Sequence, residues 1–194
     1  MAITPKAPLL AGLGGSLREK SYSLAALRET LRLAEADGAI TDLLDVRALN
    51  LPMFVPDLPV EGYPSAQQAN IIRFIEACRR ADVMIWASPT YHGAITGVVK
   101  NALDFMEFLS DDEPPYLQGR AVGLMTIPDQ TTFAGMINAV HELRAWLAPT
   151  QVTLSRQHFT AELVLNDERM QRRLMRLVKE LLGFANANMK LKKS

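Results

Sequence analysis

The stretch LLAGLGGSLREKSYS, residues 9–23, joins a short apolar run to a loop rich in glycine and serine. The run Leu9–Leu13 has the length and composition of a buried strand. Behind the loop, over Tyr22–Asp37, apolar residues recur three or four positions apart, which is the spacing of one helix face. The stretch therefore predicts a strand, a loop and a helix in that order, which is the repeating unit of an α/β fold.

The remainder of the chain repeats this alternation. Further apolar runs predict strands over Ile40–Asp45, Val83–Ala87, Ala121–Ile127 and Val152–Leu154. Helical spacing occupies residues 71–78, Gly97–Leu109, Phe133–Leu147 and Asp167–Asn188. Strands that alternate with helices favour right-handed crossovers, a parallel sheet and helices on both of its faces. We therefore expect an α/β fold, a three-layer doubly wound sandwich with a five-stranded parallel sheet.

The length of the chain, 194 residues, fits a single domain, with a core over about residues 8–188 and a basic tail over 189–194. Hydrophobic residues make up 48% of the chain and charged residues 22%, which excludes an intrinsically disordered chain. One irregular, proline-rich stretch, residues 46–66, is longer than an ordinary connection. Loops of this length are often functional or form interfaces.

The charges and the single cysteine exclude several classes of function. Lys+Arg and Asp+Glu both number 21, and zero net charge argues against a general nucleic-acid binder. Cys78 alone excludes a disulfide framework and a cysteine-based zinc site, and its core spacing gives it no functional role. The apolar run near the N-terminus is too short for a transmembrane helix and lacks the features of a signal peptide. We therefore expect a cytoplasmic protein without a membrane or metal requirement.

Three known motifs fail in the first loop. A dinucleotide fingerprint or a P-loop starting at Gly12 would need glycine where Leu17 stands, and a nucleophile elbow would need glycine where Arg18 stands. What remains is a set of small residues and hydroxyls that leads into a helix. Main-chain N–H groups, serine hydroxyls and the Arg18 guanidinium suit a terminal phosphate group. The alternative is an ordinary capped helix start, with Ser21 or Ser23 as the N-cap and Arg18 in solvent.

A second polar loop, Ser88–Gly97, follows the third predicted strand. It lies at the same edge of the expected sheet as the first loop, where α/β folds bind their ligands. Tyr91 and His92 are its candidates for ligand contacts, although a packed tyrosine and a surface histidine are the plainer alternatives.

The helix expected over Gly97–Leu109 has an apolar arc of about 160°, wider than the stripe of an ordinary surface helix. Phe108 falls outside this arc, on the polar side of the helix. We therefore expect the 97–109 helix to pack on another subunit in a homodimer or homotetramer, the alternative being a deeply buried helix in a monomer. Lys100 and Asp104 are four residues apart and can form a surface ion pair.

Together, the two loops resemble the motifs of the NADPH-dependent FMN reductase family. The first motif is G-S-L-R-x-x-S-x-S over Gly15–Ser23, and the second is S-P-x-Y-x-x-x-x-x-G-x-x-K-N-x-x-D over Ser88–Asp104. The resemblance covers about residues 8–155. It implies a flavodoxin-like fold with strand order 2-1-3-4-5, in which FMN binds where the strand order reverses.

The resemblance also implies roles for individual residues. The FMN phosphate would be held by Ser16, Arg18, Ser21, Tyr22 and Ser23. The isoalloxazine ring would be lined by Pro89, Thr90, Tyr91, His92 and Gly93; many relatives have an acidic residue in place of Thr90 and asparagine in place of His92. Thr126 and Gly135 would contribute from the loop after the fourth strand. No side chain is expected to act as a catalyst, because the flavin carries the chemistry.

The function that the resemblance implies is an FMN-containing NAD(P)H-dependent oxidoreductase of the flavin, quinone or azo-reductase type. Hydride from NADPH, or NADH, would pass to FMN and then to a second small-molecule acceptor in ping-pong turnover. Free FMN, a quinone, an azo dye and a metal oxyanion remain open as acceptors. The alternatives are a flavodoxin-type electron carrier without NAD(P)H turnover and an α/β protein that binds no nucleotide. Electron carriers are expected to be acidic, so zero net charge favours the enzyme.

Overall fold

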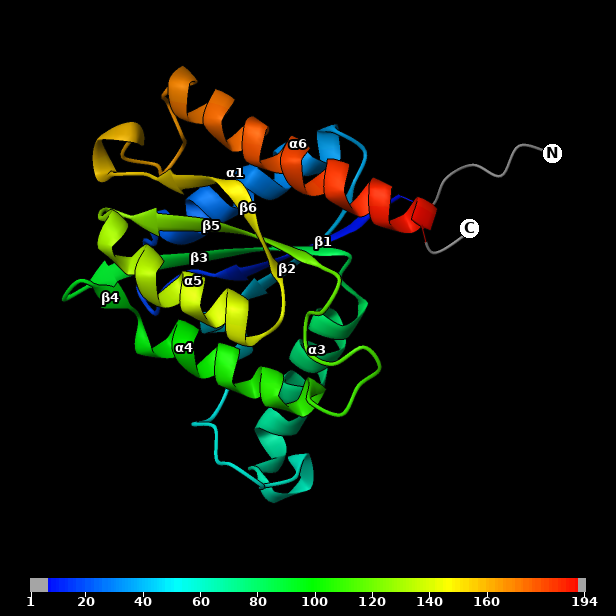
Figure 1. The fold of residues 1–194 in the computed structure, drawn as a ribbon. Coiled ribbons are helices and arrows are strands. Elements are labelled where there is room, and N and C mark those ends of the chain that lie inside the picture. The colour runs from blue at the N-terminus through cyan, green and yellow to red at the C-terminus, as the bar shows by residue number, and fades with distance from the viewer. Residues whose placement is uncertain (1–6, 192–194) are drawn as a thin grey trace.

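Five parallel strands form the middle layer of the molecule (Figure 1). The computed structural model of the chain describes residues 7–191. The strands are β1 (Leu9–Gly14), β2 (Ile40–Asp45), β3 (Val83–Tyr91), β5 (Ala121–Ile127) and β6 (Trp146–Thr153). They lie in the order β2-β1-β3-β5-β6, which confirms the expected doubly wound, flavodoxin-like arrangement. A short sixth strand, β4 (Ala94–Ile95), pairs antiparallel with the end of β3 and was not predicted.

Helices cover both faces of the sheet, and each face has its own apolar core (Figure 1). One face carries α1 (Tyr22–Ala36) and α6 (Glu168–Leu191). The other carries α3 (Ser65–Arg80), α4 (Gly97–Asp104) and α5 (Phe133–Glu142). Shorter helical turns are α2 (Val46–Leu49), η1 (Val60–Gly62), η2 (Phe105–Leu109), η3 (Gln130–Thr132) and η4 (Arg156–His158).

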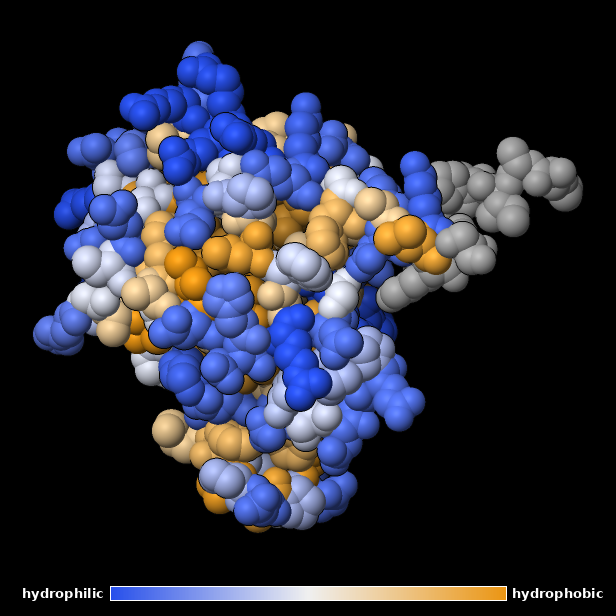
Figure 2. Space-filling model, viewed as in Figure 1, coloured by the Kyte–Doolittle hydropathy of each residue, from blue (hydrophilic) through white to orange (hydrophobic). Residues whose placement is uncertain are grey.

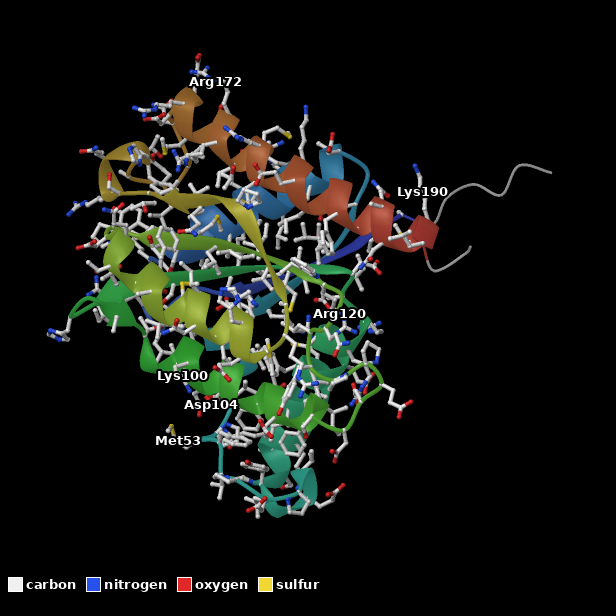
Figure 3. The ribbon with its side chains drawn as sticks, viewed as in Figure 1. Met53, Lys100, Asp104, Arg120, Arg172 and Lys190 are labelled. Atoms are coloured by element: carbon white, nitrogen blue, oxygen red, sulfur yellow. The ribbon has the colours of Figure 1, made fainter. Side chains whose placement is uncertain are left out.

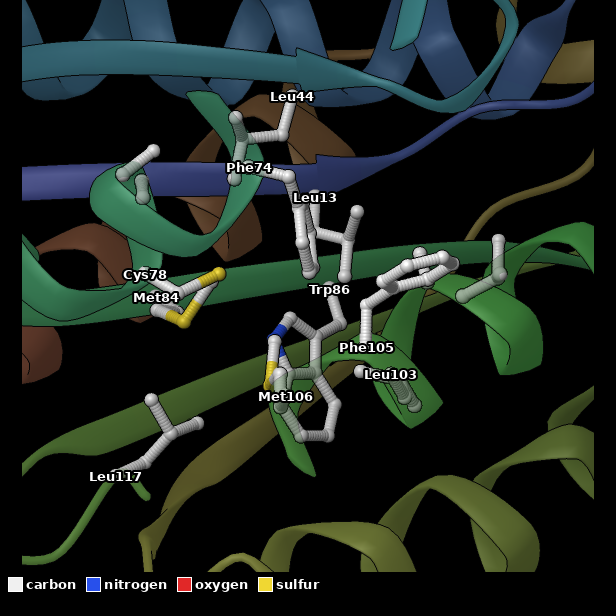
Figure 4. Close-up of a cluster of buried hydrophobic side chains, with 14 of the residues drawn as sticks. Leu13, Leu44, Phe74, Cys78, Met84, Trp86, Leu103, Phe105, Met106 and Leu117 are labelled. Atoms are coloured by element: carbon white, nitrogen blue, oxygen red, sulfur yellow. The ribbon is translucent and has the colours of Figure 1, made fainter. Parts of the chain in front are cut away.

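The central strand β3 shows why the sequence forms this sheet. Its residues Val83–Ser88 are all buried, because alternate side chains enter the two cores. Trp86 is the largest fully buried side chain, and Figure 4 shows it with Phe74 of α3 and Phe105 of η2. A strand buried on both faces reads as a continuous apolar run, which is why the sequence predicts it well.

Cys78 lies in the same core, close to Met84 (Figure 4). Burial raises the pKa of its thiol, and only the nearby Arg120 guanidinium opposes that shift appreciably. A protonated, buried thiol is a poor nucleophile. The structure thus agrees with the assignment of Cys78 to packing.

Two element boundaries differ from the prediction. The helix expected over Phe133–Leu147 ends at Glu142, and Arg144 has a φ of 60°, which turns the chain into β6. The prediction found only the apolar end of β6 because the strand lies at the sheet edge, where exposed residues interrupt its apolar run. At the C-terminus α6 continues to Leu191, and residues 192–194 of the basic tail lie outside the described residues.

The structure places Phe108 against aromatic rings of its own chain. The helix over 97–109 tightens from α4 into the 3₁₀ helix η2 after Asp104. In a 3₁₀ helix, residues three apart lie above one another, so Phe105 and Phe108 share a face and stack with ring centroids 6.2 Å apart. Phe54 packs against both rings. A period of 3.6 residues placed Phe108 on the polar side of the helix, whereas the 3₁₀ geometry turns it toward Phe54 and Phe105. A contact of this helix with another subunit stays a prediction.

The proline-rich stretch 46–66 is fastened to α4. Buried Asn101 accepts a hydrogen bond from Phe54 N–H at 2.9 Å and donates one to the Pro52 carbonyl at 2.8 Å. Beside it on α4, Lys100 and Asp104 form the expected ion pair, and Figure 3 shows them together with Met53, which points into solvent. The stretch is thus a fixed part of the fold on this side of the molecule.

The carboxyl end of β1 meets the backbone of β3 at Gly14. A Cβ atom at this position would lie 2.1 Å from the Ala87 carbonyl oxygen, so only glycine fits. The next residue, Gly15, donates its N–H to the same oxygen at 3.3 Å. The end of β1 is therefore in direct backbone contact with β3, which continues to Tyr91.

Replacing Gly14 by alanine is expected to lower the free energy of unfolding by about 2–4 kcal/mol, because the backbone must shift away from Ala87. Gly183→Ala in α6 is the control: nothing lies within 4 Å of its added Cβ. That change is expected to raise the free energy of unfolding by about 0.5–1 kcal/mol, since alanine favours a helix interior. Urea unfolding followed by circular dichroism measures both. A wild-type urea midpoint for Gly14→Ala would show that the contact is not a constraint.

Candidate functional site

A cavity of about 250 Å³ opens at the carboxyl ends of β1, β3 and β5. This edge of a doubly wound sheet is where such folds bind their ligands. Most residues that the family motifs single out line it: Ser16, Arg18, Ser21, Tyr22, Ser23, Pro89, Thr90 and Tyr91. The structure therefore brings the two motif loops, far apart in sequence, to one site.

The β1–α1 loop presents hydroxyls and main-chain N–H groups at the helix start. Ser21 is the N-cap of α1, and its Oγ accepts the Leu24 N–H at 3.2 Å. The hydroxyls of Ser21 and Ser23 lie 3.0 Å apart, and both side chains are buried. Within residues 7–191 no acceptor takes the N–H of Tyr22 or Ser23, which are among the free donors of the first helical turn. The start of α1 is therefore capped by Ser21 and still has two free N–H groups, which are the donors that an anion would need.

Arg18 links this loop to the second one. Its guanidinium lies 5.6 Å from the centroid of the Tyr91 ring, in a cation–π contact. Arg18 has no carboxylate partner among the described residues, so its charge is available to a ligand. Tyr91 is 42% exposed and forms the opposite wall of the cavity.

The second loop is a tight hairpin between β3 and β4. His92 and Gly93 have φ angles of 52° and 75°, as in the two-residue turns that close such hairpins. Both residues are exposed at the tip and do not line the cavity. The family resemblance grouped them with Pro89, Thr90 and Tyr91, because all five residues belong to one continuous motif loop.

A chain of hydroxyl groups fixes Thr90. The buried Thr132 hydroxyl donates to Thr90 Oγ1 at 2.7 Å, and the Thr90 hydroxyl donates to the Asp129 carbonyl at 2.9 Å. These bonds join the hairpin to the connection between β5 and α5. Because Thr90 uses its only hydroxyl proton inside the protein, its side chain can only accept a hydrogen bond from a ligand.

The two residues expected after the fourth strand lie elsewhere. Thr126 is fully buried on β5, with its hydroxyl 3.3 Å from that of Thr153, and it does not line the cavity. Gly135 lies on α5 and faces a separate cavity of about 420 Å³ between α4 and α5. The β5 end is instead represented in the site by Ile127 and Pro128.

Sequence reasoning also missed two cations that line the cavity, Lys20 and Arg156. Lys20 lies in the first loop but outside the motif positions. Arg156 follows β6, so the general rule that ligands bind at the carboxyl ends of strands was the only signal that could have found it. With Arg18 they give the cavity three cationic side chains and no aspartate or glutamate.

Residues 7–191 contain neither a metal-ligand cluster nor a membrane-spanning helix. No group of three or more histidine, cysteine, aspartate or glutamate side chains in this range could hold a metal ion. In the same range, no helix has the length and apolar character that crossing a membrane requires.

Comparison with known proteins agrees with the motif loops. The sequence pattern of the NADPH-dependent FMN reductase family matches residues 8–163. An NAD(P)H-dependent FMN reductase of Pseudomonas aeruginosa is 37% identical over 94 residues, 48% of this chain and 47% of that protein. The NADPH-dependent FMN reductase ArsH of Rhizobium meliloti is 26% identical over 189 residues, 94% of this chain and 74% of that protein. The first of these alignments spans 47%, less than half, of the relative's length.

Solved structures share the fold. FerB, a flavoenzyme NAD(P)H:(acceptor) oxidoreductase from Paracoccus denitrificans, superposes with a TM-score of 0.72 at 17% identity, over 94% of this chain and 99% of that chain. At this identity the likeness supports the fold alone. The family pattern, however, covers most of the sheet and both loops that line the cavity, and the chain therefore belongs to the NADPH-dependent FMN reductase family.

Proposed function

We propose that the protein is an FMN-containing NAD(P)H-dependent oxidoreductase that reduces a second small-molecule acceptor in ping-pong turnover. The observation that carries this proposal is the convergence of the two family motif loops on one cavity with three cations and no carboxylate. When bound, FMN takes a hydride from NAD(P)H and passes electrons to the acceptor.

The residues of the first loop fit a phosphate monoester. Such a group carries close to two negative charges and three acceptor oxygens. The loop offers the Arg18 guanidinium, the hydroxyls of Ser16, Ser21 and Ser23, and the free N–H groups at the start of α1. These donors suit three phosphate oxygens, and the helix N-terminus adds its positive dipole end. We therefore propose this loop, including Tyr22, as the FMN phosphate site.

Pro89, Thr90 and Tyr91 are proposed to contact the flavin ring. They line the same cavity, and Thr90 is held in one orientation by its bonds to Thr132 and Asp129. A side chain fixed in this way keeps the cavity wall in place when a ligand binds. His92 and Gly93, exposed at the hairpin tip, are left free to meet the second substrate.

The proposal gives no catalytic role to a protein acid, base or nucleophile, because the flavin carries the chemistry. The only cysteine in the chain is buried in the core, and the residues that line the cavity include no histidine, aspartate or glutamate. This lining fits a reaction whose bonds are made and broken on a cofactor. The serine hydroxyls that line the cavity have no imidazole or carboxylate group in the same lining to act as their general base.

We further propose that the enzyme works in the cytoplasm as a homo-oligomer, dimer or tetramer, that pairs through the surface around α4. Supporting this, Leu17 and Met53 are 61% and 75% exposed beside α4. They border a small cavity of about 180 Å³, which Val98 and Ala102 also line. The proline-rich stretch 46–66 also exposes Val55, and Figure 2 shows apolar side chains at the bottom of the molecule, where Figure 1 places part of this stretch. Contiguous apolar surface of this kind typically marks an interface.

The decisive experiment for the function is a flavin spectrum. Protein reconstituted with FMN is expected to show the visible flavin bands with one flavin per chain, and anaerobic NADPH is expected to bleach them within seconds. A flavodoxin-type carrier would take up FMN and stay oxidised when NADPH is added. Failure to bind added FMN at all would overturn the proposal.

Arg18→Ala is expected to weaken FMN binding by about 1–3 kcal/mol, the range for a hydrogen bond to a charged group. Arg28→Ala, an exposed cation on α1 outside the cavity, is the matched control and should bind FMN like the wild type. Quenching of flavin fluorescence gives both dissociation constants. Equal affinities for the two variants would remove Arg18 from the phosphate site.

Met53→Glu tests the proposed interface. Because Met53 is exposed, the variant is expected to fold normally, and the new charge should shift the protein toward monomer. Size-exclusion chromatography with light scattering gives the mass of each species. An unchanged mass, whether that of a monomer or of an oligomer, would rule out this surface as the subunit contact.

A further inference from the structure

We propose that Arg156 binds the pyrophosphate of the nicotinamide dinucleotide, and that the groove beyond it holds the adenosine half. The groove has a volume of about 650 Å³ and is lined by Tyr22, Pro128, Ser155, Arg156, Gln157, Phe159, Thr160 and Ala161. This inference rests on the proposed function, because it assigns a place to the reductant of that reaction.

The groove continues the cavity. Tyr22, Pro128 and Arg156 line both, so these side chains form the border between the two spaces. The nicotinamide of the reductant must reach the flavin in the cavity for hydride transfer. The cavity of about 250 Å³ has no room for the adenosine half as well, so that half must extend along a neighbouring surface. The linking pyrophosphate then crosses the border at Arg156.

The charges at the site exceed what the flavin phosphate needs. Neither the cavity nor the groove is lined by an aspartate or glutamate, although the chain as a whole is neutral. Arg18 and the α1 N-terminus already match one phosphate group. The side chain of Arg156 forms no ion pair or hydrogen bond with any residue in the described range 7–191. A guanidinium group left free in this way suits the paired oxygens of a pyrophosphate.

The backbone that carries Arg156 is well anchored. Its carbonyl accepts the Phe159 N–H at 3.2 Å, and the preceding Ser155 N–H donates to His158 Nδ1 at 3.0 Å. The His158 ring also lies near the Asp167 carboxylate. The turn is therefore fixed on both sides of Arg156, while the guanidinium itself remains available.

Two aromatic rings accompany the arginine. Tyr22 and Phe159, whose ring centroids lie 5.4 Å apart, both line the groove. Base–aromatic stacking tolerates any nucleobase, so an adenine fits this lining without a dedicated set of hydrogen bonds. The groove thus offers a cation for the pyrophosphate and aromatic rings for the adenine.

The groove on the other side of the first loop is less suitable for an anion. It is larger than the cavity, about 550 Å³, and it carries Arg28, Arg32 and Arg47 as well as Arg18. The same groove is lined by Glu19, Glu29, Asp45 and Glu162, and Glu29 pairs with Arg32. The charges that line this groove therefore cancel, whereas the groove at Arg156 has an excess of positive charge.

Steady-state kinetics of Arg156→Gln test the assignment. The FMN-loaded variant is expected to show about a tenfold higher KM for both NADPH and NADH, with kcat nearly unchanged. Turnover with dihydronicotinamide riboside, which has no phosphate and no adenosine, should equal that of the wild type. Arg169→Gln, at an exposed arginine on α6 outside both spaces, is the control and should match the wild type with all three reductants.

Calorimetry gives a readout that does not depend on turnover. ADP is expected to bind the oxidised holoprotein about tenfold more weakly after Arg156→Gln, whereas adenosine should bind both proteins equally.

A KM change confined to NADPH would place its 2′-phosphate at Arg156 and overturn the pyrophosphate assignment. Weaker FMN binding by the variant would assign Arg156 to the cofactor instead. Wild-type behaviour in an NADPH-reducible variant would overturn this inference alone, while failure of the wild type to bind FMN would overturn the proposed function.

Discussion

β1 ends against β3 where the backbone of Gly14 meets that of Ala87, and both ligand loops begin directly after this contact. A methyl group at position 14 would come within 2.1 Å of the Ala87 carbonyl oxygen, so the absence of a side chain sets how closely the strands end. Gly15 then donates its N–H to the same oxygen, which ties the first loop to β3 as it leaves the sheet. A wider separation here would move the serines of the first loop away from the wall formed by Pro89–Tyr91.

The hydroxyl groups around the cavity act mainly on the protein itself. Ser21 accepts the Leu24 N–H as a helix cap, and Thr90 is held between Thr132 and Asp129. Such bonds leave main-chain N–H groups and the cations as the strongest donors toward a ligand. Donors fixed by the fold need little reorganisation when an anion binds, and this is how a loop of small residues can hold a phosphate firmly. Hydrogen bonds within the protein therefore fix the loops that carry the donors for a ligand.

The sequence predicts those parts of the fold in which periodicity and burial agree. β1, β3 and β5 are buried on both faces, so their apolar runs are easy to find. Prediction failed where a local constraint changes the period. The 3₁₀ segment η2 moved Phe108 onto Phe54, and the exposed residues of β6 hid most of that strand.

The candidate site also has a part that the sequence predicts and a part that it does not. Its motif loops are predictable because each is continuous in sequence. Arg156 reaches the cavity, and the buried Thr132 reaches Thr90 on the cavity wall, only through the folded sheet. No short sequence pattern links either of them to the first loop. Their positions follow from the strand order, which brings the ends of β5 and β6 beside the ends of β1 and β3.

The chain as a whole has zero net charge, but the cavity is lined by an excess of positive charge. At physiological salt, charges on the surface are screened over about 8 Å, so an anion in the cavity responds mainly to the groups that line it. The charged groups that line the cavity are Arg18, Lys20 and Arg156, and the lining includes no carboxylate. In the adjoining groove, the arginines are matched by an equal number of acidic residues. A neutral protein can therefore present a strongly cationic pocket. Because the excess is confined to one pocket, it favours small phosphorylated ligands over the extended polyanions that a broad basic surface would attract.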